Sequence, residues 1–207
     1  MNDTRLESSD QPLRRLLRPA IMLTLALCVL TGLVYPGVVT LLAQVLFPRQ
    51  ADGSLISRDG QVVGSALIGQ QFAAPGYFHS RPSGAGQGYD ATASAGTNKG
   101  PTDLKLADTL IAGAVARAME EDGVERGKVP SDMATASGSG LDPHISPANA
   151  AGQVTRVAKA RGLPEADVQA LVARHTEGRQ FGILGDPRVN VLLLNLALDS
   201  LKPAAAR

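Results

Sequence analysis

The hydropathy pattern of the chain contains one long uncharged run, from Ala20 to Phe47, which reads AIMLTLALCVLTGLVYPGVVTLLAQVLF. An α-helix rises about 1.5 Å per residue and the hydrocarbon core of a bilayer is about 30 Å thick, so roughly 20 apolar residues can cross it. The run therefore predicts one transmembrane helix over residues 19–47. We expect a kink between Thr31 and Pro36, because Pro36 removes a backbone donor and crowds the preceding turn.

A cleaved secretory signal is the alternative interpretation of this run. Such a signal has an apolar region of only about 7–15 residues, followed by a small-x-small cleavage site. The present run is longer, and the residues at positions 44–48, QVLFP, contain no Ala-x-Ala site. We therefore interpret the run as a retained membrane anchor.

The charges that flank the run predict its orientation. Four arginines precede it: Arg5, Arg14, Arg15 and Arg18. The first basic residue after it is Arg49, which is soon followed by Asp52. Because short segments rich in Lys and Arg stay in the cytoplasm, we expect residues 1–18 to form a polar, mobile cytoplasmic tail. Residues 48–207 would then form one extracytoplasmic soluble domain, and the protein would be a single-pass membrane protein.

Beyond the run, the pattern first indicates strands and then a loop. Short apolar segments flank Asp59-Gly60, a strong signal for a hairpin turn, and Ala66 to Ile68 is a candidate for a further strand. The stretch from Phe72 to Gly100 is rich in Gly, Ser, Ala and Pro and has weak periodicity, so we expect a long ordered loop there.

The remainder of the chain has helical periodicity. One helix is expected from an N-cap at Thr102 to a stop at Gly123, and a second from Ser146-Pro147 to Gly162. A third should open at Pro164-Glu165 and end near Gly178, and a fourth should open at Asp186-Pro187. The expected apolar faces comprise Leu106, Leu110, Ala114 and Val115; Ala151, Val154 and Val157 or Ala158; Val168, Leu171 and Val172; and Val189, Leu192, Leu193 and Leu196. A hairpin followed by packed helices predicts an α+β domain.

Composition narrows the classes of function. Beyond the membrane run, basic and acidic residues are equal in number, which argues against nucleic acid or an anionic lipid surface as a partner. The single cysteine, Cys28, lies within the run, so the outer domain must fold without disulfides. Aromatic residues are sparse, and the core must therefore be built from Val, Leu, Ile and Ala.

One cluster carries the residue types of acyl-transfer chemistry: Ser137, Ser139, Asp142 and His144. A nucleophile elbow would read G-x-S-x-G between a strand and a helix, whereas this cluster precedes a proline-started helix. The favoured interpretation is a loop whose glycines and hydroxyls serve backbone geometry, and a membrane-anchored hydrolase is the remote alternative.

Metal and phosphate sites are also weakly indicated. The histidines His79, His144 and His175 lack the i, i+3 or i, i+4 partner of a helical metal site, and no metal is expected. The stretch Gly123 to Val129 resembles a phosphate loop only by chance, because three residues separate its glycines and Val129 replaces the magnesium-binding hydroxyl.

Three of the aromatic residues, Phe72, Tyr77 and Phe78, lie beside His79 and Arg81. Core packing is the favoured interpretation of this cluster. An aromatic and arginine cluster on a loop would also suit a protein interface.

Several motifs together resemble one family. They are TGLVYP, LIGQQF, YFHSRPS, YDATASAGTNKGP, TASGSGLDPHISPANAAGQVTRVAKARGL, HTEGR and PRVNVLLLNLAL, in this order behind one N-terminal span. From about Arg18 to Leu198 the chain resembles the C subunit of the Kdp-type high-affinity potassium-transporting ATPase of bacteria. The combination is highly specific, although no single motif is.

The resemblance implies a complex in which a channel-like A subunit conducts potassium, a P-type ATPase B subunit hydrolyses ATP and a small F subunit stabilises the assembly. This chain would be a non-catalytic accessory subunit for assembly and coupling, with ATP and potassium acting on the complex rather than as its own cofactors.

The resemblance also implies an alternative: a catalytic chaperone that raises the ATP affinity of the B subunit, with Gln153 as a candidate nucleotide contact. The arginine flank places Gln153 outside the cell, so the structural role is favoured. A generic anchored binding module is a further alternative.

Overall fold

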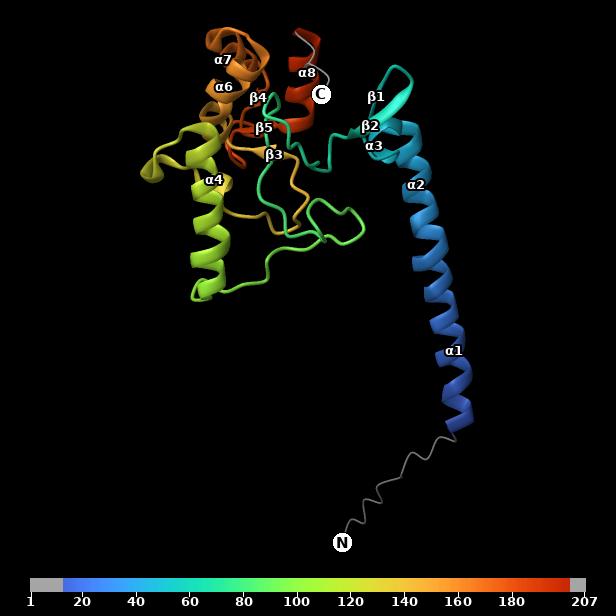
Figure 1. The fold of residues 1–207 in the computed structure, drawn as a ribbon. Helices are drawn as coiled ribbons and strands as arrows, with labels where there is room; N and C mark the ends of the chain where they lie inside the picture. Colours follow the sequence, from blue (N-terminus) through green and yellow to red (C-terminus); the bar gives the residue numbers. More distant parts are fainter. Residues whose placement is uncertain (1–12, 202–207) are drawn as a thin grey trace. The chain divides into compact units, whose positions relative to one another are not determined.

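The computed structural model describes residues 13–201, and Figure 1 shows their arrangement. The chain divides into two compact units at Gly53, the first helical and the second a mixture of helices and small sheets. The expected α+β class of the domain that follows one long apolar helix is therefore confirmed. Of the N-terminal tail expected over residues 1–18, residues 1–12 lie outside the described residues, whereas residues 13–18 already belong to the long helix.

The first unit is one long apolar helix followed by a short one. It consists of α1 (Leu13–Val29), the π-helical segment η1 (Leu30–Val34) and α2 (Tyr35–Leu46), followed by α3 (Pro48–Ala51). The segment from Arg15 to Leu46 is long and apolar enough to cross a membrane. Its most apolar stretch has a mean hydropathy of 2.2, and none of that stretch is buried against the rest of the chain. The π-helical turn lies where a kink is expected, and it widens the helix just before Pro36.

The second unit opens with the expected hairpin, β1 (Leu55–Arg58) and β2 (Gln61–Ser65). Asp59 and Gly60 have φ angles of 53° and 79°, and two positive φ values at the turn match the twist of the flanking strands. The further strand expected from Ala66 to Ile68 is wrong, because these residues form a turn instead. Residues 66–103 form a long loop without helix or strand, as the composition predicts.

The helix after this loop begins as η2 (Lys105–Ile111) and continues as α4 (Ala112–Asp122). The N-cap expected at Thr102 is wrong by one residue, because the Asp103 carboxylate accepts the hydrogen bond from the Leu106 backbone N–H. The stop at Gly123 is confirmed, with φ at 69°. The 3-10 turn η3 (Arg126–Lys128) and the short helix α5 (Ser131–Ala134) follow.

The next two helices, α6 (Pro147–Arg161) and α7 (Glu165–Arg174), begin where the sequence predicts. Ser146 caps α6 by accepting from the Asn149 N–H at 3.0 Å, and Gly162 ends it in the left-handed conformation. Helix α7 ends at Arg174, four residues before the expected Gly178, because the chain then enters a short strand. Ala151 is exposed, so its expected place on the buried face of α6 is wrong, and Ala150 lies there instead.

The last part of the chain forms a sheet that the sequence does not predict. The strands β3 (His144–Ile145), β4 (Thr176–Glu177) and β5 (Arg188–Asn190) pair antiparallel in the order β3-β5-β4. The helix expected from Asp186-Pro187 begins later, as α8 (Val191–Leu201). Val189 therefore lies on a strand, and Leu194 and Leu198 are more deeply buried than the expected Leu193 and Leu196.

The core lies where α6, α7 and α8 meet the sheet, and Figure 1 shows α6 and α7 side by side above the strands. It is built mainly from Val, Leu, Ile and Ala, as expected, together with Phe78 from the long loop. Its buried members are Phe78, Ile145, Ala150, Val154, Val157, Ala158, Val168, Leu171, Val172, Val189, Val191, Leu194 and Leu198.

Candidate functional site

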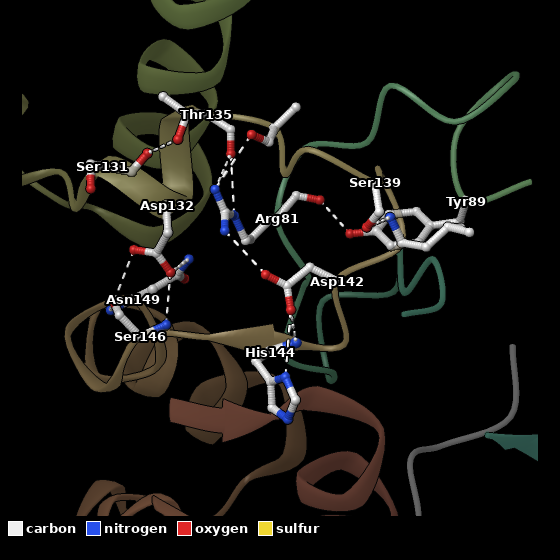
Figure 2. A network of polar contacts seen from close by, with 12 residues as sticks. Arg81, Tyr89, Ser131, Asp132, Thr135, Ser139, Asp142, His144, Ser146 and Asn149 are labelled. Atoms are coloured by element: carbon white, nitrogen blue, oxygen red, sulfur yellow. Dashed lines mark hydrogen bonds and ion pairs between the residues drawn. The ribbon is translucent and has the colours of Figure 1, made fainter. Parts of the chain in front are cut away.

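Three polar side chains fix the start of α6. The Asp132 carboxylate accepts from the Ser146 backbone N–H at 2.7 Å, from the Ser146 hydroxyl at 2.9 Å and from the Asn149 amide at 3.0 Å (Figure 2). Helix N-termini carry unsatisfied N–H groups and a partial positive charge, so a carboxylate at this position is stabilising. Asp132 thereby joins α5 to α6.

Gln153, the candidate nucleotide contact, lies in α6 and is only 2% exposed. Its Oε1 accepts from the His79 backbone N–H and from Arg156, each at 2.7 Å. Its Nε2 donates to the His79 carbonyl at 3.0 Å and to Asn149 Oδ1 at 2.7 Å. An amide group has two donors and two acceptor lone pairs, and all four are used within this chain.

Arg156 extends this network to α4. Its guanidinium donates to Asp122 at 2.7 Å, and both side chains are less than a tenth exposed. It also donates to the carbonyls of Pro75 and Tyr77 in the long loop. Burial, and next the charge of Arg156, lower the pKa of His79 below its ordinary value, so the imidazole favours the neutral form.

A second network surrounds Arg81, which lies in the long loop. The guanidinium pairs with Asp142 at 3.1 Å and donates to the carbonyls of Thr135 and Ala136, and the Tyr89 hydroxyl donates to the Arg81 carbonyl (Figure 2). Burial raises the pKa of Tyr89 to about 12, so its hydroxyl stays protonated.

Asp142 has opposing influences on its charge. Burial alone would raise its pKa, but hydrogen bonds from His144 and the charge of Arg81 outweigh burial and hold the pKa below its ordinary value. The His144 backbone N–H donates to Asp142 at 2.9 Å, and its Nδ1 lies 3.5 Å from the same carboxylate. Asp142 therefore joins the loop at residue 81 to the start of β3.

The acyl-transfer hypothesis requires a serine hydroxyl hydrogen-bonded to His144. Ser139 Oγ instead accepts from the Leu141 N–H at 3.1 Å, and Figure 2 draws no contact between Ser139 and His144. Ser137 is buried, and within residues 13–201 no hydrogen bond joins either serine to a histidine. The geometry supplies no base for a serine nucleophile.

The three candidate metal ligands lie in separate surroundings. His79 faces Glu121 and Arg156, His144 faces Asp142, and the His175 ring contacts the Leu171 carbonyl at the end of α7. In the part of the chain that the structure describes, no group of three or more His, Cys, Asp or Glu side chains could hold a metal ion. Residues 123–129, the segment that resembles a phosphate loop, begin with the C-cap of α4 at Gly123 and then form the 3-10 turn η3.

The residues of the aromatic cluster lie in two kinds of surroundings: Phe78 in the core, and Phe72 and Tyr77 outside the buried set. Phe78 is fully buried in the core, as the favoured interpretation predicts, and Phe72 and Tyr77 have ring centroids 5.7 Å apart. The Arg161 guanidinium lies 4.7 Å from the centre of the Tyr77 ring and pairs with Asp199 at 2.8 Å. The cluster therefore joins the loop to α6 and α8.

Two cavities border these networks. One of about 550 Å³ is lined by Arg81, Asp132, Asp142, His144 and Ser146 among others, and one of about 750 Å³ lies between the long loop, η2, α4 and α6. Among the charged side chains that line them, Arg81 pairs with Asp142, and Asp132 accepts from the Ser146 hydroxyl.

Sequence reasoning missed two buried asparagines that organise the same loop. Asn195 in α8 accepts from the Phe78 N–H at 2.8 Å and donates to the Phe78 carbonyl at 3.0 Å, and Asn190 donates to the Ala66 carbonyl. For Asn195 a signal was available, because it lies inside the apolar run LLLNLAL and a buried amide needs hydrogen-bond partners.

The described residues define a protein with a helix long and apolar enough to span a membrane, followed by an α+β unit in which many polar side chains bond to one another. Comparison with known proteins identifies the family: the family model of K+-transporting ATPase, c chain (KdpC), matches residues 17–200.

A potassium-transporting ATPase KdpC subunit of Gemmatimonas aurantiaca is 65% identical over 186 residues, covering 89% of this chain and 92% of the relative. The counterparts of Rhodospirillum rubrum and Koribacter versatilis are 57% identical over 191 residues and 54% over 184. They cover 92% and 89% of this chain and 98% and 94% of their own lengths. The chain belongs to the KdpC family of potassium-transporting ATPase subunits, which confirms the resemblance carried by the motifs.

Proposed function

We propose that this chain is a non-catalytic accessory subunit that assembles and couples the membrane-embedded and ATP-hydrolysing subunits of a potassium uptake ATPase. Its partners would be the channel-like A subunit, the P-type ATPase B subunit and the small F subunit that the family resemblance implies. Its α+β unit would lie outside the cytoplasm.

One observation carries this proposal: the polar side chains suited to chemistry are used to hold the long loop against the helices. Gln153 and Asn195 each accept from and donate to the backbone of this loop, and Asp132 is likewise used internally, at the start of α6. Buried polar groups with complete hydrogen bonding rigidify a fold and specify its shape. A rigid, internally bonded unit suits a protein that presents surfaces to partner subunits.

The spanning helix supports the same role. The most apolar stretch of this helix is not buried within the chain. A Cβ atom added at Gly32 or Gly37 would meet nothing within 4 Å. Small residues on membrane helices allow the backbones of neighbouring helices to approach closely. The helix would therefore serve both as an anchor and as a packing surface for partner helices.

The same network bears on the chaperone alternative. A nucleotide contact by Gln153 would have to break hydrogen bonds to His79, Asn149 or Arg156, each of which would then lose a partner. We therefore propose that any effect of this chain on ATP affinity is indirect, as a coupling free energy between states of the complex.

The test is to purify the ATPase complex from cells that express all partner subunits, with and without this chain. We expect the chain to co-purify with a tagged B subunit, to hydrolyse no ATP alone, and to be required for potassium-stimulated ATP hydrolysis. Normal assembly and potassium uptake without the chain would overturn the proposal.

A second arm separates the two mechanisms. The KM for ATP is measured for complexes that carry Thr155→Ala, an exposed change on α6, or Gln153→Glu. If Gln153→Glu raises the KM for ATP while assembly and thermal stability match the Thr155→Ala control, a direct nucleotide contact is favoured over the accessory role.

A further inference from the structure

The β1-β2 hairpin is the first element of the second unit, and the chain enters it from the spanning helix through α3. This is the only covalent connection between the two units. A displacement of the carboxyl end of the spanning helix therefore acts on the second unit first through the hairpin. How firmly the hairpin is attached to the rest of its unit decides how such a displacement is passed on.

A carboxylate in α8 holds the hairpin and also binds two other segments. Arg58 Nη1 in β1 donates to Asp199 Oδ2 at 3.3 Å. The Tyr77 hydroxyl donates to the same oxygen at 3.3 Å, and Arg161 Nη2 lies 2.8 Å from Asp199 Oδ1. The Asp199 side chain is only 14% exposed. Asp199 thereby joins the hairpin, the long loop and α6 to one residue of α8.

A second contact attaches the hairpin nearer to its base. A Cβ atom added at Gly64 in β2 would collide with the Gln70 amide and lie 2.9 Å from Leu192 Cδ2. Leu192 lies near the start of α8 and Asp199 near its end, a separation of about 10 Å along a helix. The hairpin therefore contacts two points of α8, one polar and near the turn of the hairpin, the other close-packed and near its base.

Release of Arg58 would leave no buried charge without a partner. Asp199 would keep Arg161 and the Tyr77 hydroxyl, which belong to α6 and the long loop. The Arg58 side chain is already 45% exposed, and the exposed Asp59 carboxylate lies 3.9 Å from its Nε. An ion pair with so exposed a partner changes an equilibrium constant by at most about fivefold. The docked and released states of the hairpin are therefore close in free energy.

Little apolar surface holds the hairpin in place. Leu55 and Val62 are 51% and 61% exposed, whereas a core residue such as Val157 is fully buried. Segments with few buried apolar contacts open at a low free energy while the core stays folded. The hairpin therefore has the properties of an element with two accessible states.

We propose that the β1-β2 hairpin is the coupling element of this subunit: it docks on Asp199 through Arg58 and, when released, moves about its contact at Gly64 while the core stays folded. This inference rests on the proposed function, because it names the element through which the accessory subunit couples its partners. Coupling requires two states whose equilibrium a distant site can bias, and the contact between Arg58 and Asp199 distinguishes those states.

Pulsed electron spin resonance on the full chain in detergent measures the docked fraction directly. Spin labels at Val62→Cys in β2 and Thr155→Cys in α6, both exposed positions, report one distance within the second unit in a Cys28→Ala background. Arg58→Gln should raise the released population about two- to fivefold, seen as a second distance. Arg58→Lys keeps the charge and should keep the docked distance.

Tyr77→Phe is the matched control, because it removes a different hydrogen bond from the same carboxylate and should leave the hairpin docked. Equal distance distributions in Arg58→Gln and the wild type, or the same second distance in Tyr77→Phe, would overturn the inference. Hydrogen exchange in α6 and α7 should be unchanged in Arg58→Gln. Faster exchange there would show that the core opens together with the hairpin, which also overturns it.

The assembled complex tests the coupling role. Arg58→Gln should co-purify with the B subunit in the wild-type amount but lower potassium-stimulated ATP hydrolysis at least about twofold. Arg58→Lys should restore the rate. Lys128→Gln, which breaks an exposed ion pair with Glu125 in another part of the unit, should hydrolyse ATP at the wild-type rate. A wild-type rate in Arg58→Gln would overturn the inference, even where the spin labels show release.

The wild-type chain in the same preparations separates the two proposals. If it does not co-purify with the partner subunits, or if potassium-stimulated hydrolysis does not require it, the proposed function fails. If the wild-type chain is required and Arg58→Gln is fully active, only the inference about the hairpin fails.

Discussion

Gln153 and His79 exchange two hydrogen bonds across 74 positions of sequence: the His79 N–H donates to Gln153 Oε1 at 2.7 Å, and Gln153 Nε2 donates to the His79 carbonyl at 3.0 Å. The glutamine side chain thereby pairs with the long loop as a strand edge would. Asn195 makes the same double contact with the adjacent Phe78. The loop has no helix or strand of its own, and these amides supply the partners that its backbone lacks.

Gln153→Leu should destabilise the second unit. The substitution leaves the His79 N–H and C=O buried without partners, so we expect a loss of about 2–4 kcal/mol in the free energy of unfolding. Urea unfolding of the full chain in detergent measures this loss, with Thr155→Ala on the exposed side of α6 as the control. A stability equal to that of the control would show that the hydrogen bonds to His79 are not structural.

Asp132→Ala should loosen the junction between α5 and α6. It removes a carboxylate that accepts three hydrogen bonds at the start of α6, and we expect a loss of about 1–3 kcal/mol in the free energy of unfolding. Asp108→Ala, at an exposed position, is the matched control and should change this free energy by less than about 0.5 kcal/mol. Equal losses in the two variants would contradict the capping role.

Stability should depend on pH through His79. Its pKa is lowered in the folded state, first by burial and then by Arg156, while Glu121 and Asp122 oppose the shift. The unfolded chain therefore binds the proton more readily, so the contribution of His79 is complete above pH 6.5 and declines as the pH falls through 6.5 toward the lower folded pKa. One proton gives a slope of at most about 1.4 kcal/mol per pH unit.

Urea unfolding between pH 5 and 7.5 tests this pH dependence. His79→Asn cannot bind the proton and should flatten the dependence over this range. A wild-type chain whose free energy of unfolding stays constant, or a variant with the same slope as the wild type, would contradict the prediction.

The orientation of the chain can be measured with cysteine accessibility. In a Cys28→Ala background, Thr155→Cys on the exposed side of α6 should react with a membrane-impermeant thiol reagent in intact cells. Ser9→Cys, in the segment expected to be cytoplasmic, should react only after the membrane is opened. The reverse pattern would place the second unit in the cytoplasm and revive direct nucleotide contact.

Substitutions in the spanning helix should affect assembly rather than folding. A Cβ atom added at Gly32 or Gly37 meets nothing within 4 Å, so we expect Gly32→Leu and Gly37→Leu to leave insertion and the stability of the second unit unchanged. We expect weaker co-purification with partner subunits, because larger side chains hold neighbouring helices apart. Val38→Leu is the control, and equal co-purification of the glycine variants with it would contradict a packing role for these glycines.

Local signals predicted much of the fold. Asp59-Gly60 specified the hairpin turn, Ser146-Pro147 the start of α6, and Gly123 and Gly162 the ends of α4 and α6. Each depends on the conformational preferences of a few neighbouring residues, so the sequence alone is sufficient. The apolar run was equally clear, because its length relative to a bilayer needs no tertiary information.

The sheet β3-β5-β4 could not be predicted in this way. Its strands are two or three residues long, and His144 pairs with Asn190 across 46 positions. Strands so short have no periodicity of their own and exist only through their partners. Because residues 188–190 are used as strand β5, the last helix begins only at Val191. Asn190 caps this helix by accepting from the Leu193 N–H.

The sequence by itself determined the membrane helix, the α+β class and the family, because hydropathy, local caps and ordered motifs are properties of consecutive residues. Only the tertiary structure decided what the polar residues do. Gln153 belongs to a motif that suggested a nucleotide contact, yet its amide is fully bonded to His79, Asn149 and Arg156. Whether a polar side chain is free to bind a ligand depends on partners far away in sequence, and folding brings those partners together.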